Sequence, residues 1–380
     1  MTKPLPALLA AYDQTPKIDV HSHLYAAHPP ARSIEQLVFY HMLAAELRAA
    51  GMDTSALAQH RRTHEPLDVL ALLPQAAAVW PRMRNTALAR ALHGIGRDLF
   101  GLEHPQVNLD FLRALAARIG TDADPFAWTD RVFAAAGVHT ALAAVHMDHG
   151  TGAPHGAIQY PHIVPTNEHD PFHPISDMRA HQERLQKYYG TRMTDVDGVR
   201  EYLLKHLEQT HACGARVQVK WINLERLAPV VDMARVEAAM AKANANEPWL
   251  SDDAAALQTF ELSLRLEFAR THQHVMQICL CSEYLPGTMY SMPYVQRHHV
   301  KNITAWIGRY PDVNFEILNC DTSMDQVFAT LARTHANVYL SGIWWHAMSE
   351  GYIEELIYQR VLAVPIGKLG GFFSDAYVAE

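Results

Sequence analysis

The stretch Lys17-Ile18-Asp19-Val20-His21-Ser22-His23-Leu24 joins a short apolar run to two histidines near the N-terminus. The run from Ile18 to Val20 predicts a buried strand. Histidines two residues apart point to the same side of a strand, so both imidazoles can face one metal ion. Chance is the alternative explanation, because the chain holds 24 His among its 380 residues.

After Gly137 the chain alternates between apolar runs and helical stretches. Together with 17–20, the predicted strands are 140–146, 162–166, 215–222, 274–280, 313–318, 337–342 and 368–373. The predicted helices are 176–188, 194–211, 233–245, 252–271, 293–309, 322–334 and 350–363. This alternation indicates parallel strands with right-handed crossovers, and eight such strands close most simply into a (β/α)8 TIM-type barrel. A doubly wound open sheet is the competing architecture, although no GxGxxG follows a strand.

Residues 33–135 carry almost no strand signal. A helix is predicted from Ser33 through Arg48, and further amphipathic segments lie around 67–79, 84–99, 108–118 and 125–136. The prediction therefore divides the chain into three parts. Residues 1–32 hold the N-terminal segment and the first barrel strand, residues 33–136 form a large helical insert, and residues 137–380 form the remainder of the barrel.

Composition excludes several classes of function. The net charge of −8 and the pI near 6.3 argue against nucleic acid as a partner, and no apolar run is long enough for a membrane span. No secretory signal opens the chain, and the four cysteines lack zinc-ribbon spacing, so a cytoplasmic protein is expected. The expected partner is a small-molecule substrate, and a homo-oligomer is left open.

Catalysis in a barrel takes place where the strands end, so the residues there are the candidates. The predicted strand ends carry His21, His23, His146, Asp148, His149, Glu168, Lys220, Gln277, Cys279, Asn319, Asp321, Trp344, Trp345, His346, Ser374 and Asp375.

The two ends of the chain resemble the amidohydrolase superfamily, and most closely its uronate (glucuronate) isomerase-like branch. The resemblance is carried by the HxH of residues 21–23, by the large helical insert, and by the segments Gly342-Ile343-Trp344-Trp345-His346 and Gly367-Lys368-Leu369-Gly370-Gly371-Phe372-Phe373-Ser374-Asp375-Ala376-Tyr377. It extends over most of residues 15–380, but only these ends are specific.

The resemblance implies one divalent metal ion held by His21, His23 and Asp375. Zinc is expected first, with manganese and iron as alternatives. Asp375 would also act as a base, which is chemically reasonable because a metal lowers the pKa of bound water towards 7 and a neighbouring carboxylate can accept the proton. The alternative interpretation of Ser374-Asp375 is a polar loop or a helix N-cap with no metal-binding role.

The chain departs from the superfamily pattern at two strands. Where many members have a histidine after strand five, this chain offers Cys279, either a thiolate ligand or a core residue. Where many have a histidine after strand six, it offers Asn319, which could bind substrate but is a poor ligand for a transition metal. These departures weaken a two-metal interpretation.

Lys220 lies inside an otherwise apolar strand and must reach the barrel mouth or a charged partner. Substrate binding or catalysis is favoured over a metal-bridging carbamate, and snorkelling to the rim is the structural alternative. His146 and Asp148 are further substrate-binding candidates.

The segment Trp344-Trp345-His346 predicts an aromatic pocket wall with one polar catalytic group. Packing under the last loop is the alternative for the two tryptophans. Arg360 could bind a carboxylate, although a solvated helix face is the simpler interpretation.

Three functions compete. The first is a metal-dependent hydrolase acting on a small polar or anionic substrate through a metal-activated water. The second is a uronate isomerase-like aldose–ketose isomerase of a sugar acid. The third is a degenerate barrel that binds a ligand without turnover. The absence of arginine-bearing motifs at the strand ends favours hydrolysis.

Overall fold

The computed structural model describes residues 10–11, 14–25, 28–63, 65–122, 124–144, 160–168, 186, 190, 193–222, 227–245, 247, 251–280, 282–284, 291–293, 300–319, 322–342 and 349–380. Within them, seven parallel strands form one curved sheet in the order β1-β2-β3-β4-β5-β8-β9. Their bounds are β1 Lys17–Ser22, β2 Val138–Ala144, β3 Ile163–Asn167, β4 Val217–Ile222, β5 Val275–Leu280, β8 Phe315–Asn319 and β9 Val338–Ser341.

Residues 369–375 occupy the eighth strand position and connect the two edges of this sheet. Leu369 forms a parallel bridge with Leu340 of β9, and the Val20 amide of β1 donates to the Phe372 carbonyl at 3.4 Å. Gly370 is required at this junction, because a Cβ there would lie 1.9 Å from the Ser341 hydroxyl. The predicted TIM-type barrel is confirmed, with a last strand shorter than expected.

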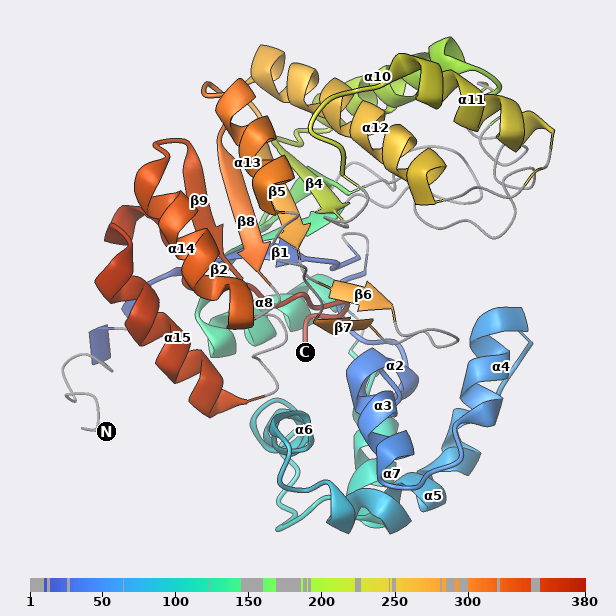
Figure 1. Ribbon diagram of the computed structural model, residues 1–380. Coiled ribbons are helices and arrows are strands. Elements are labelled where there is room, and N and C mark those ends of the chain that lie inside the picture. The colour runs from blue at the N-terminus through green and yellow to red at the C-terminus, as the bar shows by residue number, and fades with distance from the viewer. Residues whose placement is uncertain are drawn as a thin grey trace.

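Alternation along the strands separates the barrel interior from the helix-covered face. On β5, Met276 and Ile278 pack with the surrounding helices, whereas Gln277 and Cys279 point into the barrel. The covering helices are α10 Val196–Ala212, α11 Met233–Asn244, α12 Ser251–His272, α13 Val300–Arg309, α14 Asp325–Thr334 and α15 Glu350–Ala363 (Figure 1). The predicted helix 176–188 lies almost wholly outside the described residues.

A short antiparallel hairpin follows β5 and was not predicted. It pairs β6 Ser282–Tyr284 with β7 Ser291–Pro293. Three-residue strands are too short for a periodicity signal to reveal them. None of the described helices is long and apolar enough to cross a bilayer.

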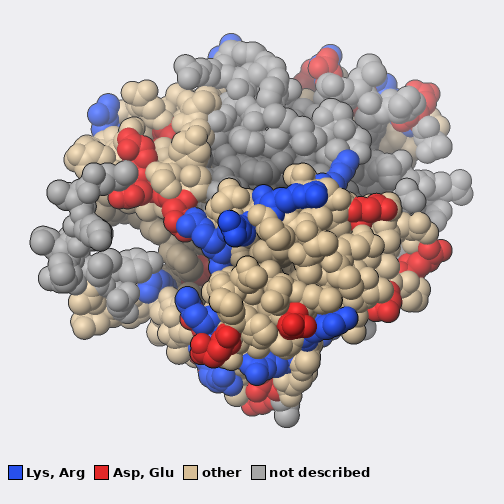
Figure 2. All heavy atoms as spheres, turned by 90° about the horizontal axis from the view of Figure 1, so that it is seen from below, with Lys and Arg blue, Asp and Glu red and all other residues tan. Residues whose placement is uncertain are grey.

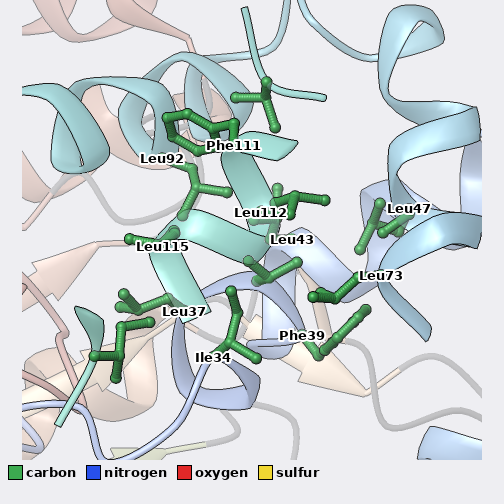
Figure 3. Packing of buried hydrophobic residues seen from close by; sticks show 14 of the residues in the cluster. Ile34, Leu37, Phe39, Leu43, Leu47, Leu73, Leu92, Phe111, Leu112 and Leu115 are labelled. Carbon is green, nitrogen blue, oxygen red and sulfur yellow. The ribbon is translucent and has the colours of Figure 1, made fainter. Parts of the chain in front are cut away.

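The helical insert follows β1 and packs around its own apolar core. Its helices are α2 Glu35–Val38, α3 His41–Ala49, α4 Ser55–Thr63, η1 Val69–Leu72, α5 Leu73–Val79, η2 Trp80–Arg82, α6 Ala87–Asp98, α7 Leu109–Arg118 and α8 Pro125–Ala136. Figure 3 shows Leu112 of α7 beside Leu43 of α3, and the ring of Phe111 beside Leu92 of α6. Viewed from the insert side, Lys and Arg are scattered among Asp and Glu, without a uniformly basic surface (Figure 2).

The predicted helix from Ser33 to Arg48 is interrupted in the structure. The chain leaves the helical conformation at Tyr40, whose ψ of 143° is extended and which caps the start of α3. Phe39 is fully buried at this break, so packing of its ring outweighs helix continuity. The break directs Tyr40 towards the C-terminal end of the barrel strands.

Candidate metal centre

Three side chains converge where β1 ends and the eighth strand position ends. The Asp375 Oδ1 atom lies 3.3 Å from His21 Nε2 and 2.9 Å from His23 Nε2. One ligand atom from each residue lies within 4.8 Å of the other two. As predicted from the HxH spacing, both imidazoles therefore face one point, which is next to Asp375 Oδ1.

Gln277 fixes the orientation of His21. Its Nε2 group donates to the Val20 carbonyl at 2.9 Å and to Glu316 Oε2 at 2.8 Å. Its Oε1 atom must then accept a hydrogen bond, which His21 Nδ1 supplies at 2.7 Å. With Nδ1 donating, His21 directs Nε2 at Asp375, the arrangement in which metal-binding histidines are usually held.

The second imidazole is bracketed by two carboxylates. His23 Nδ1 lies 3.0 Å from Glu168 Oε2, while its Nε2 faces Asp375. Glu168 follows β3 directly. A histidine between a ligand carboxylate and an outer carboxylate is again typical of a metal site, because the outer group fixes the ring and increases its basicity.

The backbone around Asp375 is held on both sides. The Asp375 amide donates to the His21 carbonyl at 3.0 Å. The preceding Ser374 donates through both its amide and its hydroxyl to the buried carboxylate of Asp19. Asp375 itself has a φ of +54°, a left-handed conformation that few residues other than glycine adopt. The position of this carboxylate is therefore set by several contacts.

The centre concentrates negative charge beside two imidazoles. Burial alone would raise the pKa of Asp375, but hydrogen bonds from His21 and His23 outweigh it and hold this pKa well below its usual range. Burial opposes charge on the histidines too, yet the charge of Glu168 and the hydrogen bond to Asp375 raise the pKa of His23 well above normal. The pocket thus stabilises a positive charge, as a cation site must.

The donor set fits a divalent cation. Ligand atoms about 2.0–2.2 Å from a tetrahedral zinc ion lie about 3.3–3.6 Å from one another. The distances from Asp375 Oδ1 to the two Nε2 atoms, 2.9 and 3.3 Å, need only a slight expansion. Two histidines and one carboxylate suit zinc, iron or manganese, and three protein ligands leave positions open for substrate.

Two tyrosines form a wall next to the triad. The Tyr377 ring stacks on His23, with ring centroids 4.5 Å apart and planes inclined by 16°. Tyr40 of the insert contacts Tyr377, with centroids 5.6 Å apart. Burial, assisted by the charge of Asp375, raises the pKa of Tyr40 far above its usual range, so its phenol stays neutral and can donate a hydrogen bond.

Lys220 lies on the other side of the sheet from the triad. Its Nζ group is 2.6 Å from Glu261 Oε2 of α12, and Arg265 Nε is 2.7 Å from the second oxygen of that carboxylate. We call the buried group around these residues the outer polar cluster; its members are Asn167, His206, Thr210, Gln218, Lys220, Glu261, Arg265 and His274. This placement gives no support to the predicted catalytic role of Lys220.

Among the described residues, the group of three converging ligand atoms includes neither Cys279 nor Asn319. Cys279 packs in an apolar cluster inside the barrel with Val219 and Leu318. The amide of Asn319 donates to Asp325 Oδ1 at 3.0 Å, and Arg360 pairs with the same carboxylate. The thiolate role of Cys279 and the substrate role of Asn319 stay predictions, whereas Arg360 is buried rather than solvated.

The other predicted substrate-binding and catalytic residues lie outside the described part of the chain. They are His146, Asp148, Trp344, Trp345 and His346.

Several residues of the centre had no role in the sequence-based prediction. Gln277 and Glu168 were noted only as strand-end residues. Asp19 is two residues before His21 and therefore on the same side of β1, a signal that could have been used. Tyr377 lies two residues after Asp375 but outside any strand, so alternation along a strand does not indicate it. Nothing in the sequence indicates Tyr40, because it belongs to the insert.

No family model matches the chain, and no curated protein matches it either. Solved structures do match. The glucuronate isomerase of Caulobacter crescentus superposes with a TM-score of 0.78 at 18% identity, over 98% of this chain and 82% of that one. The uronate isomerase of Thermotoga maritima gives 0.76 at 16% identity, over 97% and 84%. A Lactobacillus casei protein described as a metal-dependent hydrolase gives 0.59 at 14% identity, over 98% and 84%.

These similarities extend over nearly the whole chain, including the helical insert. At such low identity they show the fold alone. The chain therefore has the barrel-plus-insert fold of the uronate isomerases, the branch that its two ends resemble.

Proposed function

We propose that this chain is a metal-dependent isomerase of the uronate isomerase type, acting on the open-chain form of a sugar acid. The observation that carries the proposal is the convergence of His21, His23 and Asp375 on one point beside the neutral phenol of Tyr40. The uronate isomerases among the matching structures support it, since they superpose better than the Lactobacillus casei protein does.

The reaction moves two protons between neighbouring carbon and oxygen atoms. The C2–H bond breaks and a C1–H bond forms, while the hydroxyl proton on O2 passes to O1, so that no atom is gained or lost. A bound metal would polarise the substrate oxygens as a Lewis acid. The chain supplies a deprotonated carboxylate, Asp375, to accept a proton, and Tyr40 to donate a hydrogen bond. The face of Tyr377 that is turned away from His23 offers a flat surface against which a sugar chain can lie.

Only one metal is proposed. Among the described residues that could coordinate a cation, just the triad brings three ligand atoms together, and Lys220 and Asn319 lie on the helix-covered side. Zinc remains the first expectation, with manganese and iron as alternatives.

Hydrolysis of a polar or anionic substrate is the second candidate. It is favoured by the Lactobacillus casei similarity and by the position of Asp375, which could equally accept the proton of an attacking water. Hydrolysis would need no second proton donor beside the carboxylate, so the role of Tyr40 separates the two reactions.

The test is incubation of the metal-reconstituted protein with D-glucuronate and its epimers in D2O, followed by NMR. Isomerisation predicts a ketose product. In those turnovers in which the transferred proton exchanges with solvent, the product carries one deuterium at C1. The Tyr40→Phe variant should lose most of the rate and keep its metal. A parallel panel of amides, lactones and esters tests hydrolysis. Turnover of that panel alone, unaffected by Tyr40→Phe, would reject the isomerase proposal.

A further inference from the structure

Residues 376–380, here called the C-terminal strap, run from the metal centre into the core of the helical insert. Val378 is buried in the insert's apolar cluster, and the Ala379 amide donates to the Pro29 carbonyl at 2.8 Å. Figure 1 shows the C-terminus between the barrel strands and the insert helices. The strap is thus a direct covalent link between Asp375 and the insert.

The far end of the strap is held by the side chain of Glu380. Its Oε1 atom accepts a hydrogen bond from the Trp128 indole at 2.7 Å, and its Oε2 atom accepts one from the Ala31 amide at 2.9 Å. Trp128 lies on α8 and is itself buried. Hydrogen bonds to an ionised carboxylate are among the stronger ones in proteins, so this contact is an anchor rather than a passing surface interaction.

The near end of the strap is joined to the metal centre. The Ala376 carbonyl accepts from the His23 amide at 2.8 Å, one residue after Asp375. Tyr377 stacks on the His23 ring. Asp375, with its left-handed φ of +54°, is therefore joined directly to a residue whose carbonyl is fixed by the other metal-site element.

We propose that Glu380 is a positioning residue, which holds Asp375 in its metal-binding orientation by fixing the strap to the insert. The inference rests on the metal centre of the proposed function. A ligand that is pre-oriented loses less conformational freedom on binding. Glu380 contacts none of the three ligands itself, so its effect is expected at the low end of the about 10–100-fold that direct outer contacts of metal ligands contribute. Metal affinity is thereby linked to the packing of the insert, although its helices supply no ligand of the triad.

The test measures the dissociation constant of zinc by competition with a chelator, in the full chain stripped of metal. We compare wild type with Glu380→Ala, Trp128→Phe and the double variant. Each single variant should bind zinc about 10-fold more weakly. The double variant should resemble Glu380→Ala, since both changes break the same contact. Glu65→Ala, at an exposed glutamate of the same insert, is the matched control and should bind zinc as wild type does.

Circular dichroism and thermal unfolding of the metal-free variants complete the experiment. Unchanged zinc affinity with lowered thermal stability would overturn the proposal, because the strap would then be structural only. If Glu380→Ala does not fold, Trp128→Phe, which keeps a ring in the core, decides by itself. Failure of wild type to bind zinc, manganese or iron would reject the metal centre, an outcome distinct from equal binding by all variants.

Discussion

The metal centre and the outer polar cluster are built from the same types of residue but on opposite sides of the sheet. In the metal centre, His21 and His23 turn their Nε2 atoms to one carboxylate, so the site favours the binding of a cation from solvent. In the outer polar cluster, Lys220 and Arg265 already share the carboxylate of Glu261, so its charges are internally matched.

The difference teaches what separates a functional constellation from a structural one. Charged side chains are buried in both places, so burial alone does not mark a site. Here each imidazole has its Nδ1 atom next to an outer polar group and its Nε2 atom next to the Asp375 carboxylate. That arrangement indicates a site that binds a cation. A lysine with its counterion on the neighbouring helix indicates a closed network that stabilises one packing arrangement.

The largest effect is expected from the metal centre. Removing a ligand with Asp375→Asn or His23→Ala should lower turnover by about 10³-fold or more, because the metal contributes several kcal/mol to transition-state stabilisation. Initial rates on the active sugar acid, measured with saturating metal, check this. The Lys220→Met variant should keep its rate within a few-fold if it folds. If Lys220→Met lowered turnover as much as the ligand variants do, the outer polar cluster would be part of the catalytic machinery rather than a structural network.

The outer polar cluster should instead determine stability. Glu261→Leu leaves Lys220 and Arg265 without their shared counterion and should lower the free energy of unfolding by about 3–5 kcal/mol. Chemical denaturation of the metal-free protein measures it. Asp252→Asn breaks an exposed ion pair of the same helix, with Arg235, and should cost less than about 1 kcal/mol. Similar losses in the two variants would contradict the assignment of a buried network.

Two buried glutamines, one in the metal centre and one in the outer polar cluster, allow a matched comparison of these two regions. Gln277→Leu removes the acceptor that orients His21 and should weaken metal binding about 10–100-fold. Gln218→Leu, on the adjacent strand, removes contacts to Arg265 and His274 and should leave metal affinity unchanged while lowering stability. Chelator competition and denaturation on both variants decide. If Gln218→Leu weakened metal binding as much as Gln277→Leu does, the metal centre and the outer polar cluster would not be independent.

The smallest effect concerns pH. Burial, with the charge of Arg265, lowers the pKa of His206 to about 3, whereas an unfolded histidine titrates near 6.5. Between these values the unfolded state binds more protons, so stability present above about pH 6.5 is lost as the pH falls. The loss from His206 should reach roughly 1–3 kcal/mol by pH 4.

Denaturation of wild type and His206→Gln at pH 7 and pH 4.5 measures this contribution. The variant should show the weaker dependence on pH, and His139→Gln, at an exposed histidine, should follow wild type. Parallel behaviour of all three proteins would exclude His206 as a source of acid sensitivity.

Much of the fold could be predicted because it depends on periodicity. Parallel strands buried on both sides appear as apolar runs, and α15 was predicted with the bounds that the structure has. The break at Tyr40 could not be predicted, because it results from burial of Phe39 in a tertiary core. The eighth strand was expected over 368–373, yet only Leu369 forms a bridge there.

The triad could be predicted because each member follows a strand end. The contact of Lys220 with α12 could not be predicted, because the alternation of β4 places Gln218 and Lys220 on one side without revealing whether that side faces the barrel interior or the helices. Glu261 and Arg265, four residues apart on a helix, were the available signal for a partner. Glu168, Gln277 and Tyr40 meet only through the fold, and no local pattern connects them.

The central claim is that His21, His23 and Asp375 hold one metal ion, and metal content tests it most directly. Elemental analysis on protein purified without added metal should find about one equivalent per chain in wild type and in Lys220→Met. His21→Ala and Asp375→Ala should contain almost none, even after reconstitution with zinc, manganese or iron. Wild type that binds no metal after reconstitution, or variants that retain the full equivalent, would contradict the account.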